Sequence, residues 1–108
     1  MSNFETVTPD QVPAGAKIID IREQDEWDLG HVEGAVHIPM GEVPDRLDEI
    51  DPDEDNYIIC RSGGRSRRLC EWLDAQGYTV IDIAGGSGAW LEAELPLASE
   101  TGQDPTIR

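Results

Sequence analysis

Short apolar runs that alternate with helix-forming stretches are the feature that most limits how this chain can fold. Four runs have the length and apolar content of buried strands, and they are Lys17–Ile21, Ala35–Ile38, Tyr57–Cys60 and Thr79–Ile83. A helix-forming stretch follows each of them, at Glu23–Leu29, Glu42–Ile50, Ser66–Gln76 and Ala89–Ala93. Because parallel neighbours need a long connection, usually a helix, this alternation predicts an α/β fold with a mostly parallel sheet.

The length of 108 residues fits one domain. The pattern of strands and helices decays after Pro96, so we expect a domain over residues 1–96 and a flexible C-terminal tail over residues 97–108. In open parallel sheets, sites form beyond the carboxyl ends of the strands. Three segments should therefore meet there, namely Asp20–Arg22, Cys60–Ser66 and Ala84–Gly88.

Acidic residues dominate the charge of the chain. The formal net charge is −15 at pH 7, with a single lysine against 23 acidic residues. This balance argues against nucleic acid and against an anionic membrane as partners, since both attract basic surfaces. We interpret the charge as a source of solubility, and it would also suit a salt-rich cytoplasm.

The sequence shows no signal for a membrane or for export. No apolar stretch approaches the length that crosses a bilayer, and the N-terminal residues lack the basic start and apolar centre of a secretory signal. We therefore expect a cytoplasmic protein, in which Cys60 and Cys70 remain thiols. The two cysteines lack the Cys and His spacing of a zinc site, so nothing in the sequence argues for a metal or a cofactor.

The segment from Cys60 to Ser66 lies between the clearest strand and the clearest helix. Its two consecutive glycines permit a tight turn in which backbone N–H groups point inward, and the following helix presents the positive end of its dipole to the same point. Four of the eight basic residues fall within eight positions after Cys60, namely Arg61, Arg65, Arg67 and Arg68. These surroundings favour the thiolate form of Cys60. By contrast, Cys70 lies inside the helix and is expected to be a packing residue.

The Cys60-Arg-Ser-Gly-Gly-Arg-Ser66 segment resembles the active-site loop of rhodanese-like domains. Other motifs similar to this family precede it, at Asp20-Ile-Arg22, Glu26-Trp-Asp-Leu-Gly-His31, Gly34-Ala35 and Ile38-Pro39. Gly77-Tyr78 and Ala84-Gly-Gly86, followed by Trp90, are similar to the family's closing motif. The resemblance covers roughly residues 5–95, with the motifs in the family's order and spacing.

The resemblance implies a rhodanese-like three-layer domain with a five-stranded sheet flanked by helices, and the activity of a thiosulfate sulfurtransferase. It makes Cys60 the catalytic residue, whose thiolate takes the outer sulfur of thiosulfate or a related sulfane-sulfur donor and becomes a persulfide. The persulfide sulfur then passes to cyanide, a thiol or a protein acceptor in a ping-pong reaction. Arg61 and Arg65 would bind the sulfonate oxygens of the donor. The persulfide would lie in a cradle formed by Arg61, Ser62, Gly63, Gly64, Arg65 and Ser66.

Other interpretations of these residues stay open. Asp20, Arg22, Glu26 and His31 are assigned to the scaffold, although His31 and Cys60 could form a Cys–His pair. A cysteine phosphatase or arsenate reductase also carries a Cys…Arg loop before a helix, but with one residue more than the four that separate Cys60 from Arg65. The shorter loop favours a sulfur atom over a tetrahedral oxyanion. A non-catalytic interaction domain is a further alternative, against which the intact Cys60 loop argues.

Overall fold

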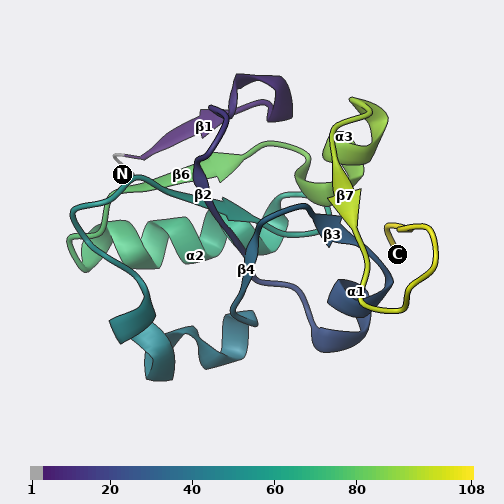
Figure 1. The fold of residues 1–108 in the computed structure, drawn as a ribbon. Helices are drawn as coiled ribbons and strands as arrows, with labels where there is room; N and C mark the ends of the chain where they lie inside the picture. Colours follow the sequence, from purple (N-terminus) through teal and green to yellow (C-terminus); the bar gives the residue numbers. More distant parts are fainter. Residues whose placement is uncertain (1–3) are drawn as a thin grey trace.

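Residues 4–108 are described in a computed structural model of the chain, which has a five-stranded sheet at its centre (Figure 1). The strand order is β1-β6-β5-β2-β4, and all four pairings are parallel. These strands are β1 (Glu5–Val7), β2 (Lys17–Asp20), β4 (Val36–His37), β5 (Asn56–Ile59) and β6 (Val80–Ile83). The expected α/β fold with a parallel sheet is therefore confirmed. Two further strands, β3 (His31–Val32) and β7 (Leu97–Ala98), pair antiparallel in a small separate sheet.

Helical segments connect the strands along the chain. They are η1 (Pro9–Gln11), α1 (Gln24–Leu29), η2 (Met40–Glu49), α2 (Gly64–Ala75) and α3 (Gly86–Glu92). The expected helix over residues 42–50 is instead the 3₁₀ segment η2, with non-helical dihedral angles at Arg46. Pro44 lies inside it, and since proline has no backbone N–H to donate, it opposes a regular α-helix there.

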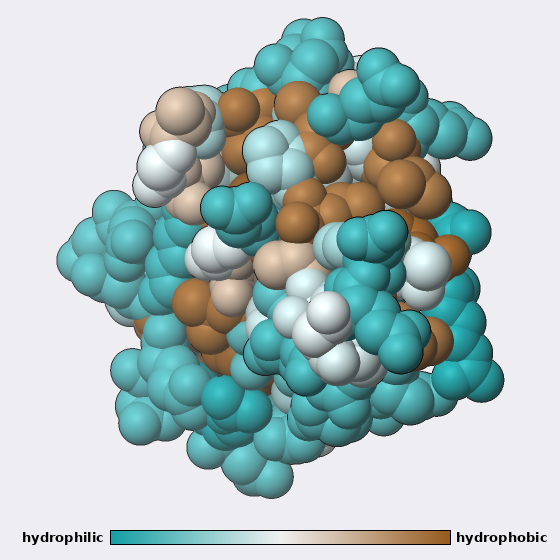
Figure 2. All heavy atoms as spheres, turned by 45° about the vertical axis from the view of Figure 1, so that its right-hand side comes forward, coloured by the Kyte–Doolittle hydropathy of each residue, from teal (hydrophilic) through white to brown (hydrophobic). Residues whose placement is uncertain are grey.

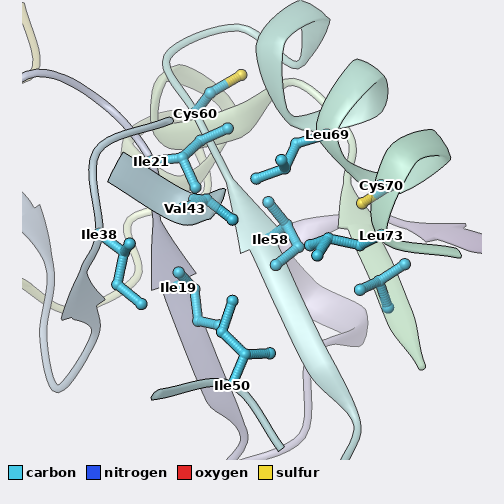
Figure 3. Packing of buried hydrophobic residues seen from close by; sticks show 11 residues of the cluster. Ile19, Ile21, Ile38, Val43, Ile50, Ile58, Cys60, Leu69, Cys70 and Leu73 are labelled. Atoms are coloured by element: carbon cyan, nitrogen blue, oxygen red, sulfur yellow. The ribbon is translucent and has the colours of Figure 1, made fainter. Parts of the chain in front are cut away.

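Helices pack through apolar side chains on both faces of the sheet, so the molecule has three layers. On one face, Ile58 and Cys60 pack with Leu69, Cys70 and Leu73 of α2 (Figure 3). On the opposite face, a second cluster surrounds Trp90 of α3, with members Ile18, Val32, Ile59 and Ile83. The alternation of Ile58 and Ile59 between the two clusters follows from the two-residue period of a strand. Because β5 is anchored on both faces, the residue that follows it, Cys60, has a fixed position.

The C-terminal segment after Pro96 contacts the domain at several points. Val32 lies opposite Leu97 in the small sheet. Farther along, the N–H of Glu100 donates to the carbonyl of Asp28, and the N–H of Thr106 donates to the carbonyl of Leu29. A hydrogen bond between the side chain of Arg61 and the carbonyl of Arg108 places the segment beside the Cys60 loop. The flexibility expected of residues 97–108 stays a prediction.

Hydrophilic side chains cover most of the face seen in Figure 2, with apolar patches between them. This surface agrees with the strongly acidic composition of the chain. Among the residues that the structure describes, no helix is both long and apolar enough to cross a membrane.

Candidate active site

The sulfur of Cys60 lies at the start of α2, directly after the end of β5 (Figure 3). It accepts hydrogen bonds from the backbone N–H of Gly63, at 3.0 Å, and of Ser66, at 3.3 Å. Cys60 is only 1% exposed, so these donors act with little competition from water. Two N–H groups and the positive end of a twelve-residue helix meet at one sulfur. This arrangement favours negative charge on Cys60.

The turn that aims these N–H groups depends on Gly63. This residue precedes the first residue of α2 and has a φ of 109°, in the region that favours glycine. A β-carbon at Gly63 would also lie 3.4 Å from the backbone nitrogen of Gly85. The sequence predicts a turn with two glycines, and Gly63 is the one whose backbone conformation requires glycine.

A second loop, between β6 and α3, holds the Cys60 loop from the side. The N–H of Ser87 donates to the carbonyl of Cys60 at 2.7 Å, and the N–H of Gly88 donates to the carbonyl of Arg61 at 3.0 Å. Gly86 has a φ of 59°, and a β-carbon there would lie 2.2 Å from the carbonyl oxygen of Cys60. Of the three segments expected to meet at the carboxyl ends of the strands, two, Cys60–Ser66 and Ala84–Gly88, are joined directly by these hydrogen bonds.

The expected donor-binding arginines both have partners within the chain. Arg65 forms a two-pronged ion pair with Glu26 of α1, with nitrogen–oxygen distances of 3.0 and 3.1 Å. This hydrogen-bonded pair lowers the pKa of the Glu26 carboxyl and raises that of the Arg65 guanidinium. The Nε of Arg61 donates to the carbonyl of Arg108 at 2.9 Å. Arg65 therefore ties the loop to α1 in addition to any role toward a substrate.

The remaining members of the loop divide between surface and interior. Ser62 and Gly64 are exposed, whereas the side chain of Ser66 is fully buried. The Ser66 hydroxyl lies 3.4 Å from the sulfur of Cys60 and 2.6 Å from a carboxylate oxygen of Asp82 on β6. Asp82 is not among the site residues predicted from the sequence. An acidic residue inside the otherwise apolar strand Val80–Ile83 was the available signal.

The residues assigned to the scaffold make structural contacts. Asp20 and Arg22 are both fully buried and form an ion pair of 2.9 Å, and Arg22 also donates to the carbonyl of Gly30. The ring of His31 stacks on Trp27 with ring centroids 3.5 Å apart. Its Nδ1 lies 3.0 Å from the carbonyl of Val32. These contacts give His31 a packing role.

Cys70 has the surroundings of a packing residue. It is fully buried in the apolar cluster beneath α2, and burial raises the pKa of its thiol well above the usual range. A thiol with a raised pKa stays protonated and is a poor nucleophile. In the described part of the chain, no group of three or more His, Cys, Asp or Glu side chains is placed to hold a metal ion.

Comparison with known proteins identifies the family. Residues 8–93 match the rhodanese-like domain. The chain belongs to the rhodanese-like family. A putative sulfurtransferase of Bacillus subtilis is 42% identical over 73 residues, which are 68% of this chain and 71% of the relative. A thiosulfate sulfurtransferase of Pseudomonas entomophila is 33% identical over 95 residues, covering 83% of this chain and 87% of the relative.

The rhodanese-like fold is also evident from solved structures. A rhodanese-related protein of Thermoplasma volcanium superimposes with a TM-score of 0.83, covering 88% of this chain and 98% of that protein at 23% identity. The three-layer fold expected from the sequence is therefore confirmed. The relatives named sulfurtransferases support a transferase of the rhodanese family.

Proposed function

We propose that this rhodanese-like chain is a thiosulfate sulfurtransferase that carries sulfur as a persulfide on Cys60. The observation that carries the proposal is the sulfur of Cys60 held between the N–H groups of Gly63 and Ser66 at the start of α2. Such donors stabilise an anionic sulfur as an oxyanion hole stabilises oxygen. The thiosulfate sulfurtransferase named among the relatives supports thiosulfate as the donor.

The reaction has two half-reactions, both of which conserve atoms and charge. In the first, the Cys60 thiolate attacks the outer sulfur of thiosulfate, the S–S bond of thiosulfate breaks, and sulfite leaves with the bonding electron pair. In the second, cyanide or a thiolate attacks the outer sulfur of the persulfide. The Cys60–sulfur bond breaks, thiocyanate or a new persulfide leaves, and the Cys60 thiolate is restored. Covalent storage of the sulfur splits one transfer into two displacements.

In this proposal the residues from Arg61 to Ser66 bind the donor and the persulfide. Arg61 exchanges the backbone oxygen of Arg108 for a sulfonate oxygen of the donor. Glu26 engages one N–H on each terminal nitrogen of Arg65. Since a guanidinium has five N–H donors, Arg65 keeps others for the donor. Two free thiols agree with the cytoplasmic location that we propose.

Intact-mass measurement tests the two half-reactions directly. The protein should gain the mass of one sulfur atom after incubation with thiosulfate and lose it after addition of cyanide. Peptide mapping should place the added sulfur on Cys60. A protein that gains no sulfur from thiosulfate, or gains it on Cys70, would contradict the proposal.

The length of the Cys60 loop separates this proposal from a phosphatase. Four residues between Cys60 and Arg65 close a small ring around one sulfur, whereas a phosphoryl group needs room for three equatorial oxygens. We therefore expect no useful hydrolysis of p-nitrophenyl phosphate by a preparation that turns over thiosulfate. Hydrolysis comparable with sulfur transfer would favour the phosphatase instead.

A further inference from the structure

One buried hydroxyl, that of Ser66, connects the sulfur of Cys60 to a buried carboxylate on β6. The Ser66 hydroxyl lies 3.4 Å from the sulfur of Cys60 and 2.6 Å from a carboxylate oxygen of Asp82. Cys60 is 1% exposed, Ser66 is 0% exposed and Asp82 is 3% exposed. A thiol, a hydroxyl and a carboxylate thus form a short chain from which water is excluded.

The surroundings of Asp82 raise the free energy of its ionised form. Val80, two residues earlier on β6, belongs to the apolar cluster beneath α2. In the sheet, Asp82 lies opposite Thr6 of β1 and Ile58 of β5, neither of which carries a charge. An isolated buried carboxylate is strongly disfavoured, so Asp82 gains stability by taking up a proton.

We propose that Asp82, acting through Ser66, receives the thiol proton of Cys60 when the thiolate forms. The S–H bond of Cys60 breaks and its proton binds the oxygen of Ser66, while the original hydroxyl proton of Ser66 passes to Asp82. Ser66 remains a neutral hydroxyl that now donates to the thiolate. Asp82 becomes a neutral carboxylic acid, and no proton enters or leaves the site.

The charges around Asp82 agree with this exchange. Burial raises the pKa of Asp82, and the hydrogen bond from Ser66 and the positive charge of Arg67 offset part of that rise. The thiol of Cys70, on the α2 side, stays neutral because burial raises its pKa. Asp82 is a positioning residue in this account, because it touches the reacting sulfur only through Ser66.

An Asp82 that keeps its charge over the whole pH range would act only by repulsion, disfavouring a nearby thiolate. Cys60 would then titrate in a single step. Proton transfer between the two groups predicts two steps, so the shape of the pH profile distinguishes the two.

The pH dependence of Cys60 alkylation tests the proposal. The form with a thiolate and a neutral Asp82 holds as many protons as the form with a thiol and an ionised Asp82. Its population is therefore independent of pH while the pair holds one proton. We expect the rate of alkylation by iodoacetamide, followed by peptide mass, to show a plateau between two rises.

Asp82→Asn should remove the plateau. No carboxylate remains to take up the proton, so the rate should rise about tenfold with each unit of increasing pH across that range, as a single titration requires. Asp48→Asn removes an exposed carboxylate of η2 and should keep the plateau. A single rise in the wild type, or a plateau that persists in Asp82→Asn, would overturn the proposal.

Infrared spectroscopy supplies a readout that a purely structural role would not change. On the plateau, the wild type should show the carbonyl stretch of a buried carboxylic acid. The band should be absent in Asp82→Asn and weaker in Cys60→Ala, which has no thiol proton to give. A band that is unchanged in Cys60→Ala would refute the transfer, even if an Asp82 variant failed to fold.

This inference rests on the proposed function in one respect only, namely that the Cys60 thiolate attacks a sulfur donor. Alkylation and infrared spectra need no sulfur donor. A chain that shows the plateau but gains no sulfur from thiosulfate would therefore refute the proposed donor and leave the proton transfer intact.

Discussion

At the residue scale, Cys60 and Cys70 are both buried thiols with opposite surroundings. The sulfur of Cys60 accepts two backbone hydrogen bonds, whereas Cys70 packs among apolar side chains of the α2 cluster. We expect Cys60→Ser to abolish persulfide formation. Cys70→Ser should keep most of the activity and cost about 1–3 kcal/mol of stability, the range for a buried hydroxyl without a partner.

Intact mass after thiosulfate measures the activity of both cysteine variants, and urea unfolding measures their stability. Circular dichroism serves as the control for folding. A folded Cys70→Ser protein that forms no persulfide would contradict the assignment of sulfur transfer to Cys60 and point to Cys70 instead.

The ion pair of Glu26 with Arg65 makes part of the stability depend on pH. Because the pKa of Glu26 is lowered in the folded protein, its contribution is present above the unfolded pKa of about 4.3 and is lost as pH falls through the folded value. Glu26→Gln should therefore cost about 0.5–1 kcal/mol at neutral pH, since the pair is partly exposed. The cost should vanish in acid.

Urea unfolding of the wild type and Glu26→Gln at several pH values measures this difference. Asp48→Asn, a surface substitution on η2, provides the control. A difference that stays constant from neutral pH into acid would show that the pair contributes nothing through its charge.

The types of residue and their order in the sequence predict only part of this site. The glycines and arginines after Cys60 predict an anion-binding loop, because all of its groups are close in sequence. The partners of that loop are distant in sequence, since Glu26 precedes Arg65 by 39 positions and Asp82 follows Ser66 by 16. Such pairings depend on strand order, which the strand–helix alternation leaves open. Asp82 is thus identified as a site residue only by the structure.

At the scale of elements, the long periodic segments are predictable, whereas most of the two- and three-residue strands are not. Strands β2, β5 and β6 and helix α2 follow the apolar periods of the sequence, with ends shifted by a residue or two. Strands β1, β3 and β7 contain two or three residues each and are not evident from the sequence. So short a strand has no measurable period and forms because a neighbouring strand offers unpaired backbone groups.

The loops after β5 and β6 are in close contact, so a single methyl group added between them should lower both the stability and the rate of persulfide formation. Gly86→Ala would place a β-carbon 2.2 Å from the carbonyl oxygen of Cys60 at a positive φ. We expect a stability loss of about 1–3 kcal/mol, typical of overpacking. The rate of persulfide formation should fall, since the loop must move away from α3.

Gly41→Ala is the matched control, because a β-carbon at Gly41 meets no heavy atom within 4 Å and its φ is not positive. Urea unfolding and the rate of sulfur gain should be measured for both variants. Equal behaviour of the two alanine variants would mean that the loops do not constrain each other.

At the scale of the whole molecule, charge repulsion opposes the folded state. Eight basic residues cannot neutralise 23 acidic ones, and the protein measures only 38 × 28 × 23 Å. At about 0.01 M salt the screening length is about 30 Å, so most carboxylates repel one another, whereas at about 1 M salt it is about 3 Å. The unfolded chain separates the same charges over a larger volume. Screening should therefore stabilise the folded protein.

We expect the melting temperature to rise by several degrees from about 0.01 M to about 1 M NaCl, since about 1 kcal/mol corresponds to roughly 4–8 °C in a domain of this size. KCl should have the same effect, because screening depends on ionic strength and not on the cation. A variant with Asp48→Lys and Asp104→Lys, both at exposed positions, should melt higher at low salt and respond less to added salt. A melting temperature that falls with salt would mean that attractive pairs such as Arg46 with Glu49 outweigh the repulsion, because screening weakens attraction and repulsion alike.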